Sequence, residues 1–146
     1  MLIEVIVAFT IVAICVVIHA TGMLVFAEWI LKRRSIIRVQ NGLTHYALLL
    51  ILVFAVVIFL HLTEAALWAG FYYWQHLFED YETSLYFSLS CYTTIGFGDV
   101  VLPQRWRLLG AVEGVSGVLL CGLSTAFIFA IVNAFFRLRM RNEDET

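Results

Sequence analysis

The segment TTIGFGDV, residues Thr93–Val100, decides how this chain folds. Two glycines flank Phe97, an acid follows at Asp99, and long apolar stretches lie on both sides. Glycine permits backbone angles that other residues avoid, but irregular backbone exposed to lipid leaves peptide groups without hydrogen bonds. At membrane depth, such a segment must therefore be buried in protein or line a water-filled path.

The composition is that of a membrane protein. The chain has 146 residues, of which 62% are hydrophobic and 14% charged, whereas soluble domains average about 45–50% apolar and about 25% charged residues. The net charge of −2 gives no reason to expect a nucleic-acid partner. Cys15, Cys91 and Cys121 lie far apart in apolar or membrane-depth segments, so we interpret them as small buried hydrophobic residues rather than a disulfide framework or metal site.

Three apolar runs predict three transmembrane helices. They cover Leu2–Leu31, Leu43 to about residue 60 with an extension to Trp74 left open, and Leu108–Phe136. Each is about as long as, or longer than, the roughly 20 residues that cross a hydrocarbon core as a helix. We therefore predict an all-α membrane protein with an N-terminal span and basic loop (1–42), a central domain (43–136) and a short tail (137–146). The first run has no basic segment before it, which argues against a signal peptide.

Basic residues predict the orientation. Four lie in Lys32–Arg38 and three in Arg137–Arg141, whereas only Arg105 and Arg107 fall on the other side. The positive-inside rule then places the first loop and the C-terminus in the cytoplasm and the N-terminus outside. The aromatic cluster from Trp68 to Trp74 is expected at the outer interface. The basic residues of the first loop serve as topology anchors, and membrane lipid is the expected surrounding partner.

A short helix is predicted just before the glycine segment. Ser84–Tyr92, SLYFSLSCY, is too short to span but long enough to dip into the membrane and return. Asp80 and Glu82 would lie at its start, where the helix dipole favours acids. The negative end of the dipole would point to membrane depth, where it favours a cation.

The motif resembles the selectivity filter of potassium channels, in which backbone carbonyls replace the water shell of the ion. The order of span, pore helix, filter and span, over roughly 43–136, is similar to the pore domain of small bacterial channels of this superfamily. The resemblance implies that Thr94, Ile95, Gly96 and Phe97 supply ion-binding carbonyls, that Thr94 adds its hydroxyl, and that Gly98 completes the outer mouth. Because one chain has one filter segment, it also implies a homotetramer. Potassium is then the permeant ion, with no cofactor.

Two residues differ from the usual pattern of the family. Phe97 replaces the commoner tyrosine, and Cys91 stands where threonine is usual. On glycines alone, the segment could instead be an ordinary outer turn with Asp99 in water.

The third span contains several small residues. Gly114 and Gly122 are interpreted as sites of close helix packing. Gly117 resembles the hinge glycine of the family's inner helix. In that case Val118, Cys121 and Thr125 recur on one face and are predicted to line the cavity below the filter.

Carboxylates supply the candidate filter supports. In many relatives a pore-helix carboxylate braces the filter, but this chain has Ser90 at that position. One hypothesis is that Glu64 or Glu113 replaces it by hydrogen bonding to Ser90, Tyr92 or Thr93. The alternative is a structural acid, neutral or paired, with Arg105 or Arg107 as partners for Glu113. Asp99 is expected to attract cations at the outer mouth and to bond the hydroxyl of Tyr86.

The histidines give a weak metal signal. His61 and Glu64 are three residues apart and share a helix face, but the sequence offers no third ligand nearby. We therefore interpret them as a hydrogen-bonded pair, and His19 and His45 as satisfied helix histidines.

The predicted function is a potassium channel of the plasma membrane that conducts ions without chemistry. The alternatives are a poorly selective cation channel and a non-conducting membrane subunit that binds a partner through its first span. An enzyme is not expected, because the sequence shows no Ser–His or Cys–His constellation, and no small-molecule substrate is expected either.

Overall fold

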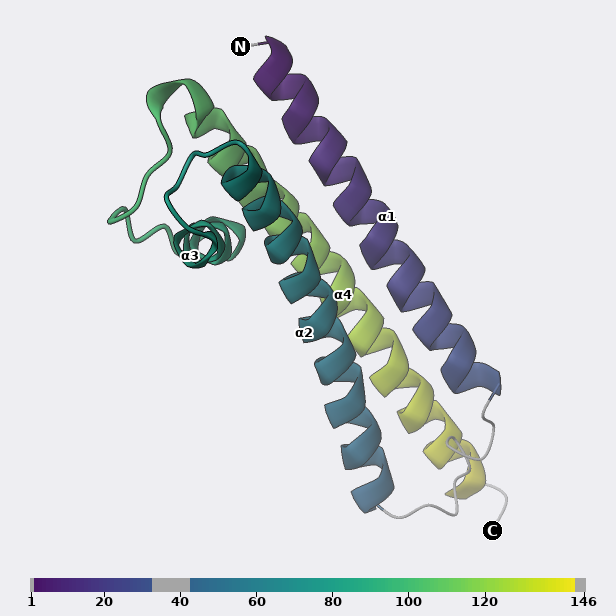
Figure 1. The fold of residues 1–146 in the computed structure, drawn as a ribbon. Helices are drawn as coiled ribbons and strands as arrows, with labels where there is room; N and C mark the ends of the chain where they lie inside the picture. Colours follow the sequence, from purple (N-terminus) through teal and green to yellow (C-terminus); the bar gives the residue numbers. More distant parts are fainter. Residues whose placement is uncertain (1, 33–42, 144–146) are drawn as a thin grey trace.

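Three long helices and one short helix make up the described part of the protein. The computed structural model describes residues 2–32 and 43–143. The helices are α1 (Leu2–Lys32), α2 (Leu43–Trp74), α3 (Tyr81–Tyr92) and α4 (Arg107–Glu143), with a 3₁₀ turn, η1, at Gln104–Trp106. The long helices run side by side, and α3 lies across them near one end (Figure 1). This is the predicted all-α architecture.

The three long helices match the predicted spans. The segments 2–32, 46–74 and 104–137 are long and apolar enough to cross a membrane. The second helix continues without a break to Trp74, which decides the extension that the sequence left open. The third continues beyond Phe136 to Glu143.

The chain reverses direction at each long helix. The start of α1 lies at the same end of the bundle as α3 and the loop that follows it (Figure 1). The last part of α4 lies at the opposite end, beside the end of α1. A membrane crossed by all three helices would therefore have the glycine segment on the side of the N-terminus, as the charge pattern predicts.

One face of α1 belongs to the core of the bundle. Its buried positions recur every three or four residues, which is the spacing of a single helix face. They are Glu4, Ala8, Ile11, Cys15, His19, Met23, Phe26 and Ile30. This face packs against both α2 and α4, so the first helix is part of the fold.

Helix α3 begins three residues earlier than predicted because Asp80 caps it. The backbone N–H of Thr83 donates to Asp80 Oδ1 at 2.7 Å, and the Thr83 hydroxyl donates to Oδ2 at 3.0 Å. These bonds to Thr83 lower the pKa of Asp80. The cap satisfies backbone donors at the start of the helix and fixes where the chain turns into the bundle.

Aromatic residues of α2 hold α3 in place. Tyr72 is fully buried, and its ring lies 5.3 Å from that of Phe87 on α3. Trp68 is also fully buried, whereas Trp74 is 73% exposed. Trp68 and Tyr72 therefore pack in the core of the bundle, and the depth of the aromatic cluster at the outer interface stays a prediction.

Candidate functional site

The glycine segment has a backbone conformation that recurs at every second residue. Thr94, Gly96 and Gly98 have positive φ angles of 60°, 57° and 80°. Glycine adopts such angles readily, but a threonine with positive φ is uncommon, and such residues concentrate at functional sites. The segment is therefore held in an unusual conformation by its surroundings.

Those surroundings are the end of α3. Thr94 N–H donates to Cys91 O at 2.9 Å, Gly96 N–H donates to Ser90 O at 3.1 Å, and Phe97 N–H donates to Ser90 Oγ at 3.3 Å. The N–H and C=O of a trans peptide point in opposite directions, and the described chain has no cis peptide. The carbonyls of Ile95 and Gly96, which share peptide groups with two of these N–H donors, therefore point away from α3.

Ser90 thus bonds the glycine segment directly. The sequence singled it out as the position where a bracing carboxylate was missing. The structure shows its hydroxyl and its carbonyl both accepting hydrogen bonds from the segment. Thr93 instead caps α3, with its hydroxyl donating to Leu89 O at 2.6 Å.

A second set of contacts supports the segment at its far end. The Tyr86 hydroxyl donates to Asp99 Oδ2 at 2.7 Å, as predicted. This bond lowers the pKa of the Asp99 carboxyl and raises that of the Tyr86 phenol. The ring of Phe97 stacks on Tyr86 at 6.2 Å with 8° between the planes. Phe97 lacks a hydroxyl, and its ring contact with Tyr86 ties it to α3.

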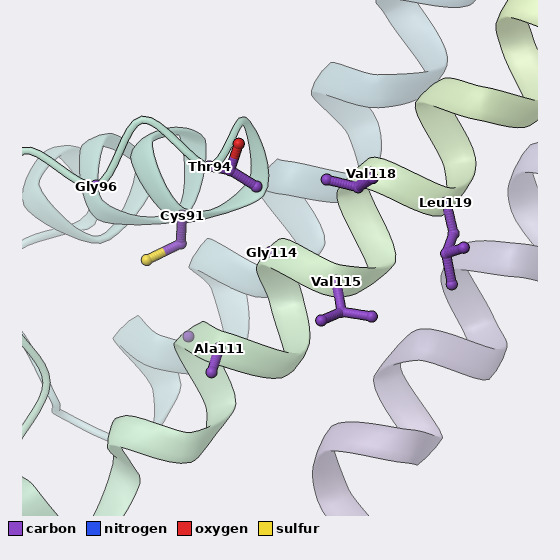
Figure 2. A pocket seen from close by; sticks show the side chains of 9 residues that line it. Cys91, Thr94, Gly96, Ala111, Gly114, Val115, Val118 and Leu119 are labelled. Atoms are coloured by element: carbon purple, nitrogen blue, oxygen red, sulfur yellow. The ribbon is translucent and has the colours of Figure 1, made fainter.

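An open hollow lies between the glycine segment and the first half of α4 (Figure 2). Cys91, Thr94 and Gly96 line one side. Residues of α4 line the other, namely Gly110, Ala111, Gly114, Val115, Val118 and Leu119. Ile95 and Phe97 are 58% and 65% exposed in the single chain. Within the single chain, the segment is therefore supported by α3 on one side and is open on the other.

Small residues of α4 permit the close approach of α3. A Cβ atom on Gly117 would lie 2.1 Å from Tyr92 O, and one on Gly114 would lie 3.1 Å from Cys91 O. Gly122 has nothing within 4 Å, so the packing interpretation is wrong for it within this chain. Gly117, expected as a hinge, makes the tightest of these contacts.

The predicted cavity face of α4 is exposed. Val118, Cys121 and Thr125 are all exposed in the single chain, and Thr125 Oγ donates to Cys121 O at 2.9 Å within the helix. Their role in lining a cavity stays a prediction. The expectation that all three cysteines are buried is wrong for Cys121, which is exposed, and for Cys91, which is half-buried; Cys15 is buried, and all three are free.

The two buried carboxylates have different partners. Glu113 accepts hydrogen bonds from the Tyr72 hydroxyl at 2.7 Å and from Ser88 Oγ. The predicted pairing of Glu113 with arginine is wrong, because the Arg105 guanidinium donates instead to Glu4, at 2.8 Å, and Arg107 Nε donates to Leu102 O. Glu113 thus supports the middle of α3. Ser88 Oγ also lies 2.7 Å from Ala65 O of α2, a second acceptor for the same hydroxyl hydrogen.

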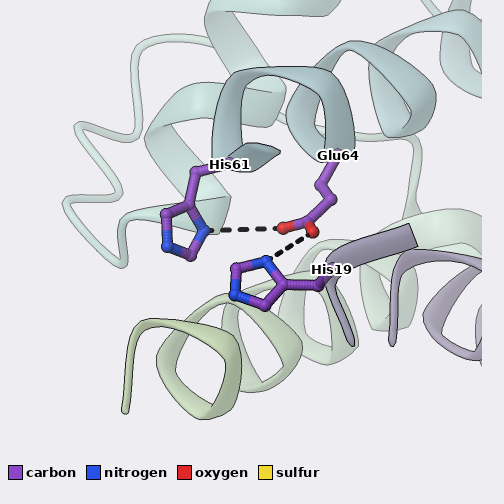
Figure 3. Close-up of side chains that lie close together, drawn as sticks. All are labelled: His19, His61 and Glu64. Carbon is purple, nitrogen blue, oxygen red and sulfur yellow. Dashed lines mark hydrogen bonds and ion pairs between the residues drawn. The ribbon is translucent and has the colours of Figure 1, made fainter. Parts of the chain in front are cut away.

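Glu64 reaches the end of α3, as hypothesised. The Tyr92 hydroxyl donates to its Oε2. Its other oxygen lies 2.8 Å from Nδ1 of His19, which comes from α1 (Figure 3). His61 Nδ1 lies 3.5 Å from Glu64, but its hydrogen bond is to the Tyr92 hydroxyl at 2.8 Å. The expected His61–Glu64 hydrogen bond is therefore replaced by bonds to other helices.

Sequence reasoning missed one group of neighbours. His19 is satisfied, as expected, but its Nε2 lies 2.9 Å from Ser124 Oγ on α4. A Ser–His contact and a third residue beside His61 and Glu64 thus exist in space, although the sequence showed neither. Ser124 is 3% exposed, so its hydroxyl is buried between the helices. His19 falls on the same three- to four-residue spacing as the other buried residues of α1. That spacing was the available signal.

Some predicted residues lie outside the described part of the chain. These are Arg33, Arg34 and Arg38 of the basic loop and the side chains of His45, Arg139 and Arg141.

A comparison with protein families identifies the matched region. The family model described as "Ion channel" matches residues 46–134, which include most of α2, α3, the glycine segment and most of α4. No curated protein and no solved structure matches the chain.

Proposed function

We propose that this chain, which belongs to the ion channel family, forms a potassium-selective pore that conducts K⁺ passively across the plasma membrane. The observation that supports selectivity most is the backbone of Thr94–Gly98. Positive φ angles recur at every second residue, and the N–H groups of Gly96 and Phe97 are bonded to Ser90. Carbonyl oxygens facing away from the pore helix are the groups that replace the water shell of a potassium ion.

In this proposal Thr94, Ile95, Gly96 and Phe97 provide the ion-binding carbonyls. Thr94 adds its hydroxyl at the inner end, and Gly98 completes the outer mouth. Asp99 remains ionised at the outer mouth, because the Tyr86 hydroxyl lowers the pKa of its carboxyl, and there it attracts cations.

Four chains form the pore. One chain offers one row of carbonyls, and a filter needs a ring of them. The exposed side chains of Ile95 and Phe97 and the open hollow against α4 give neighbouring chains surfaces to cover. The N-terminus then lies outside the cell and the C-terminus in the cytoplasm, as the basic residues indicate.

Flux through purified protein in liposomes tests the proposal. Wild-type protein should pass K⁺ and be blocked by barium. Gly96→Ala should abolish flux, because φ is 57° at this residue and a Cβ strains such a conformation. Gly70→Ala is the matched control, because a Cβ there meets nothing within 4 Å and its φ is not positive. Its flux should equal that of the wild type.

Reversal potentials separate the three functions. With potassium and sodium on opposite sides, a selective pore should reverse near the potassium equilibrium potential. A reversal near zero would identify a poorly selective cation channel. No flux from correctly assembled wild-type protein would favour the non-conducting subunit.

Thiol reagents test the predicted cavity face. A reagent applied from the cytoplasmic side should block wild-type flux at Cys121, and Cys121→Ser should remove the block. In that background Val118→Cys and Thr125→Cys should restore it. Leu123→Cys is the control, because Leu123 lies on the opposite side of α4 and is 45% exposed. Equal block at Leu123→Cys would show that the assigned face is wrong.

A further inference from the structure

We propose that His19, His61 and Glu64 form a binding site for a divalent transition-metal ion of the zinc class, buried between α1 and α2. Their ligand atoms lie within 4.8 Å of one another. Two imidazoles and a carboxylate are a ligand set that zinc uses when a fourth position is left for another oxygen. The site lies apart from the filter segment, so the proposal does not rest on potassium conduction.

Both histidines present the same nitrogen to the carboxylate. Nδ1 of His19 lies 2.8 Å from Glu64 Oε1, and Nδ1 of His61 lies 3.5 Å from Glu64 Oε2 (Figure 3). Their other nitrogens meet a single hydroxyl, because Nε2 of His19 and of His61 lie 2.9 Å and 3.0 Å from Ser124 Oγ. Two Nδ1 atoms and a carboxylate therefore converge, with both rings held from behind by Ser124.

The second shell matches that of a metal-binding histidine pair. Such histidines normally donate their remaining ring N–H to an oxygen, which fixes the tautomer and orients the ring. The Ser124 oxygen has two lone pairs and so accepts from both Nε2–H groups. Each Nδ1 then carries a lone pair, as a metal ligand requires, and those lone pairs lie beside Glu64.

The cluster has fewer hydrogens than its hydrogen-bond contacts need, which favours a bound cation. Five contacts close a ring from Glu64 through His19, Ser124, His61 and Tyr92 back to Glu64. Each contact needs one hydrogen. With Glu64 ionised, both imidazoles neutral and Ser124 accepting twice, only the two Nε2–H groups and the Tyr92 hydroxyl supply hydrogens, which is two fewer than the five contacts need. A buried cluster with this unmatched negative charge is costly, and a bound cation removes the cost.

The chemistry of the ligands selects the class of ion. Imidazole nitrogen suits zinc and its neighbours, whereas calcium and magnesium prefer oxygen. The Tyr92 hydroxyl, bonded to both His61 and Glu64, is the oxygen next to the site. Glu64 and His19 are fully buried, and the His61 side chain is 17% exposed, so the ion enters along His61.

Zinc titration of the full chain tests this site. Purified protein in detergent, freed of metal with a chelator, is titrated with Zn²⁺ in competition with a chromophoric chelator. We expect one saturable site per chain, with little competition from Ca²⁺ or Mg²⁺. His19→Gln and Glu64→Gln should weaken binding at least about tenfold, and Ser124→Ala by about 10–100-fold, as loss of a second-shell partner does.

His76→Asn is the matched control. His76 is exposed, lies outside the cluster, and has a φ of 54°, which asparagine tolerates. Its Zn²⁺ affinity should equal that of the wild type. An equal loss in this variant, or unchanged affinity in His19→Gln, would overturn the proposal.

A measurement on the unaltered chain covers variants that fail to fold. Diethyl pyrocarbonate modifies accessible histidines, and mass spectrometry locates the modified residues. Zn²⁺ should protect His61 and leave His76 reactive. No stoichiometric Zn²⁺ binding, or no protection of His61, would mean that protons alone complete the ring, and the metal site would be rejected.

Discussion

The hydroxyl of Tyr86 sets the charge at the outer end of the filter segment. It donates to Asp99, lowers the pKa of that carboxyl below its ordinary value of 3.8, and is itself harder to ionise. A lowered pKa means that the contribution of the pair to stability is fully present above the ordinary value. It is lost as the pH falls through the lowered value. Asp99 therefore stays negative at physiological pH.

Tyr86→Phe should move the acid sensitivity of the pore to higher pH. Without the hydroxyl, the pKa of Asp99 returns toward 3.8, so Asp99 is protonated earlier as external pH is lowered. The measurement is potassium flux in liposomes as a function of external pH. Tyr81→Phe is the control, since Tyr81 is an exposed tyrosine of the same helix. The prediction is contradicted by the same midpoint in Tyr86→Phe and wild type.

Gly117→Ala should destabilise the protein and stop conduction. The new Cβ would lie 2.1 Å from Tyr92 O, a backbone atom that cannot move without displacing the end of α3. Overpacking of this kind costs about 1–3 kcal/mol. Gly122→Ala, where nothing lies within 4 Å, should keep its stability or gain about 0.5–1 kcal/mol.

Unfolding in detergent measures the stability of Gly117→Ala and Gly122→Ala. Potassium flux in liposomes measures their conduction. If Gly117 serves instead as a hinge, Gly117→Ala should unfold like the wild type and change only the fraction of time that the pore is open.

At the scale of the elements, Glu113 joins three helices. It lies on α4 and accepts hydrogen bonds from Tyr72 on α2 and Ser88 on α3. Ser88 also bonds the carbonyl of Ala65 on α2. These buried bonds help to fix the position of α3 between its neighbours.

Glu113→Leu should therefore loosen α3. Leucine offers no acceptor, so the buried Tyr72 hydroxyl loses its partner, whereas Ser88 can still donate to Ala65 O. A buried donor left unsatisfied costs about 1–3 kcal/mol in the free energy of unfolding. Chemical denaturation in detergent measures this change. Glu79→Leu, at an exposed carboxylate, is the control, and equal losses in the two variants would contradict the role assigned to Glu113.

At the scale of the molecule, α1 completes the core of the bundle. Its buried stripe packs against α2 and α4, its start makes a polar contact with η1, and its middle makes polar contacts with α2 and α4. Glu4 pairs with Arg105, and His19 contacts Glu64 and Ser124. The family match begins at residue 46, after α1. Helix α1 thus lies outside the matched region. The side chains of α1 nevertheless bind it firmly to that region.

Ala8→Leu tests whether α1 is integral to the fold. Ala8 is fully buried, so a larger side chain should cost about 1–3 kcal/mol of stability through overpacking. Ala13→Leu makes the same change on the exposed face of α1 and should leave stability nearly unchanged. Thermal unfolding of both variants gives the comparison. Equal stability of Ala8→Leu and Ala13→Leu would mean that α1 is only loosely attached.

The sequence by itself determined the long apolar helices, the short helix and the position of the glycine segment. These depend on local quantities: the length of an apolar run, an acid at a helix start, and glycines at fixed spacing. The contact between Tyr86 and Asp99 was also within reach, because a short helix and the segment that returns along it leave few alternatives. Ser90 was found as a position, but its hydrogen bonds to Gly96 and Phe97 were not.

Only the tertiary structure decided which buried polar groups meet. His19 lies 45 residues from Glu64 and 105 from Ser124, and Glu4 lies 101 residues from Arg105. Each pairing depends on the rotation and axial register of long helices whose hydropathy is nearly uniform around their circumference. Hydropathy shows that such helices lie in a membrane but does not select a face. Packing of α1 against α2 and α4 determines which face is buried. This packing brings His19, His61 and Glu64 together.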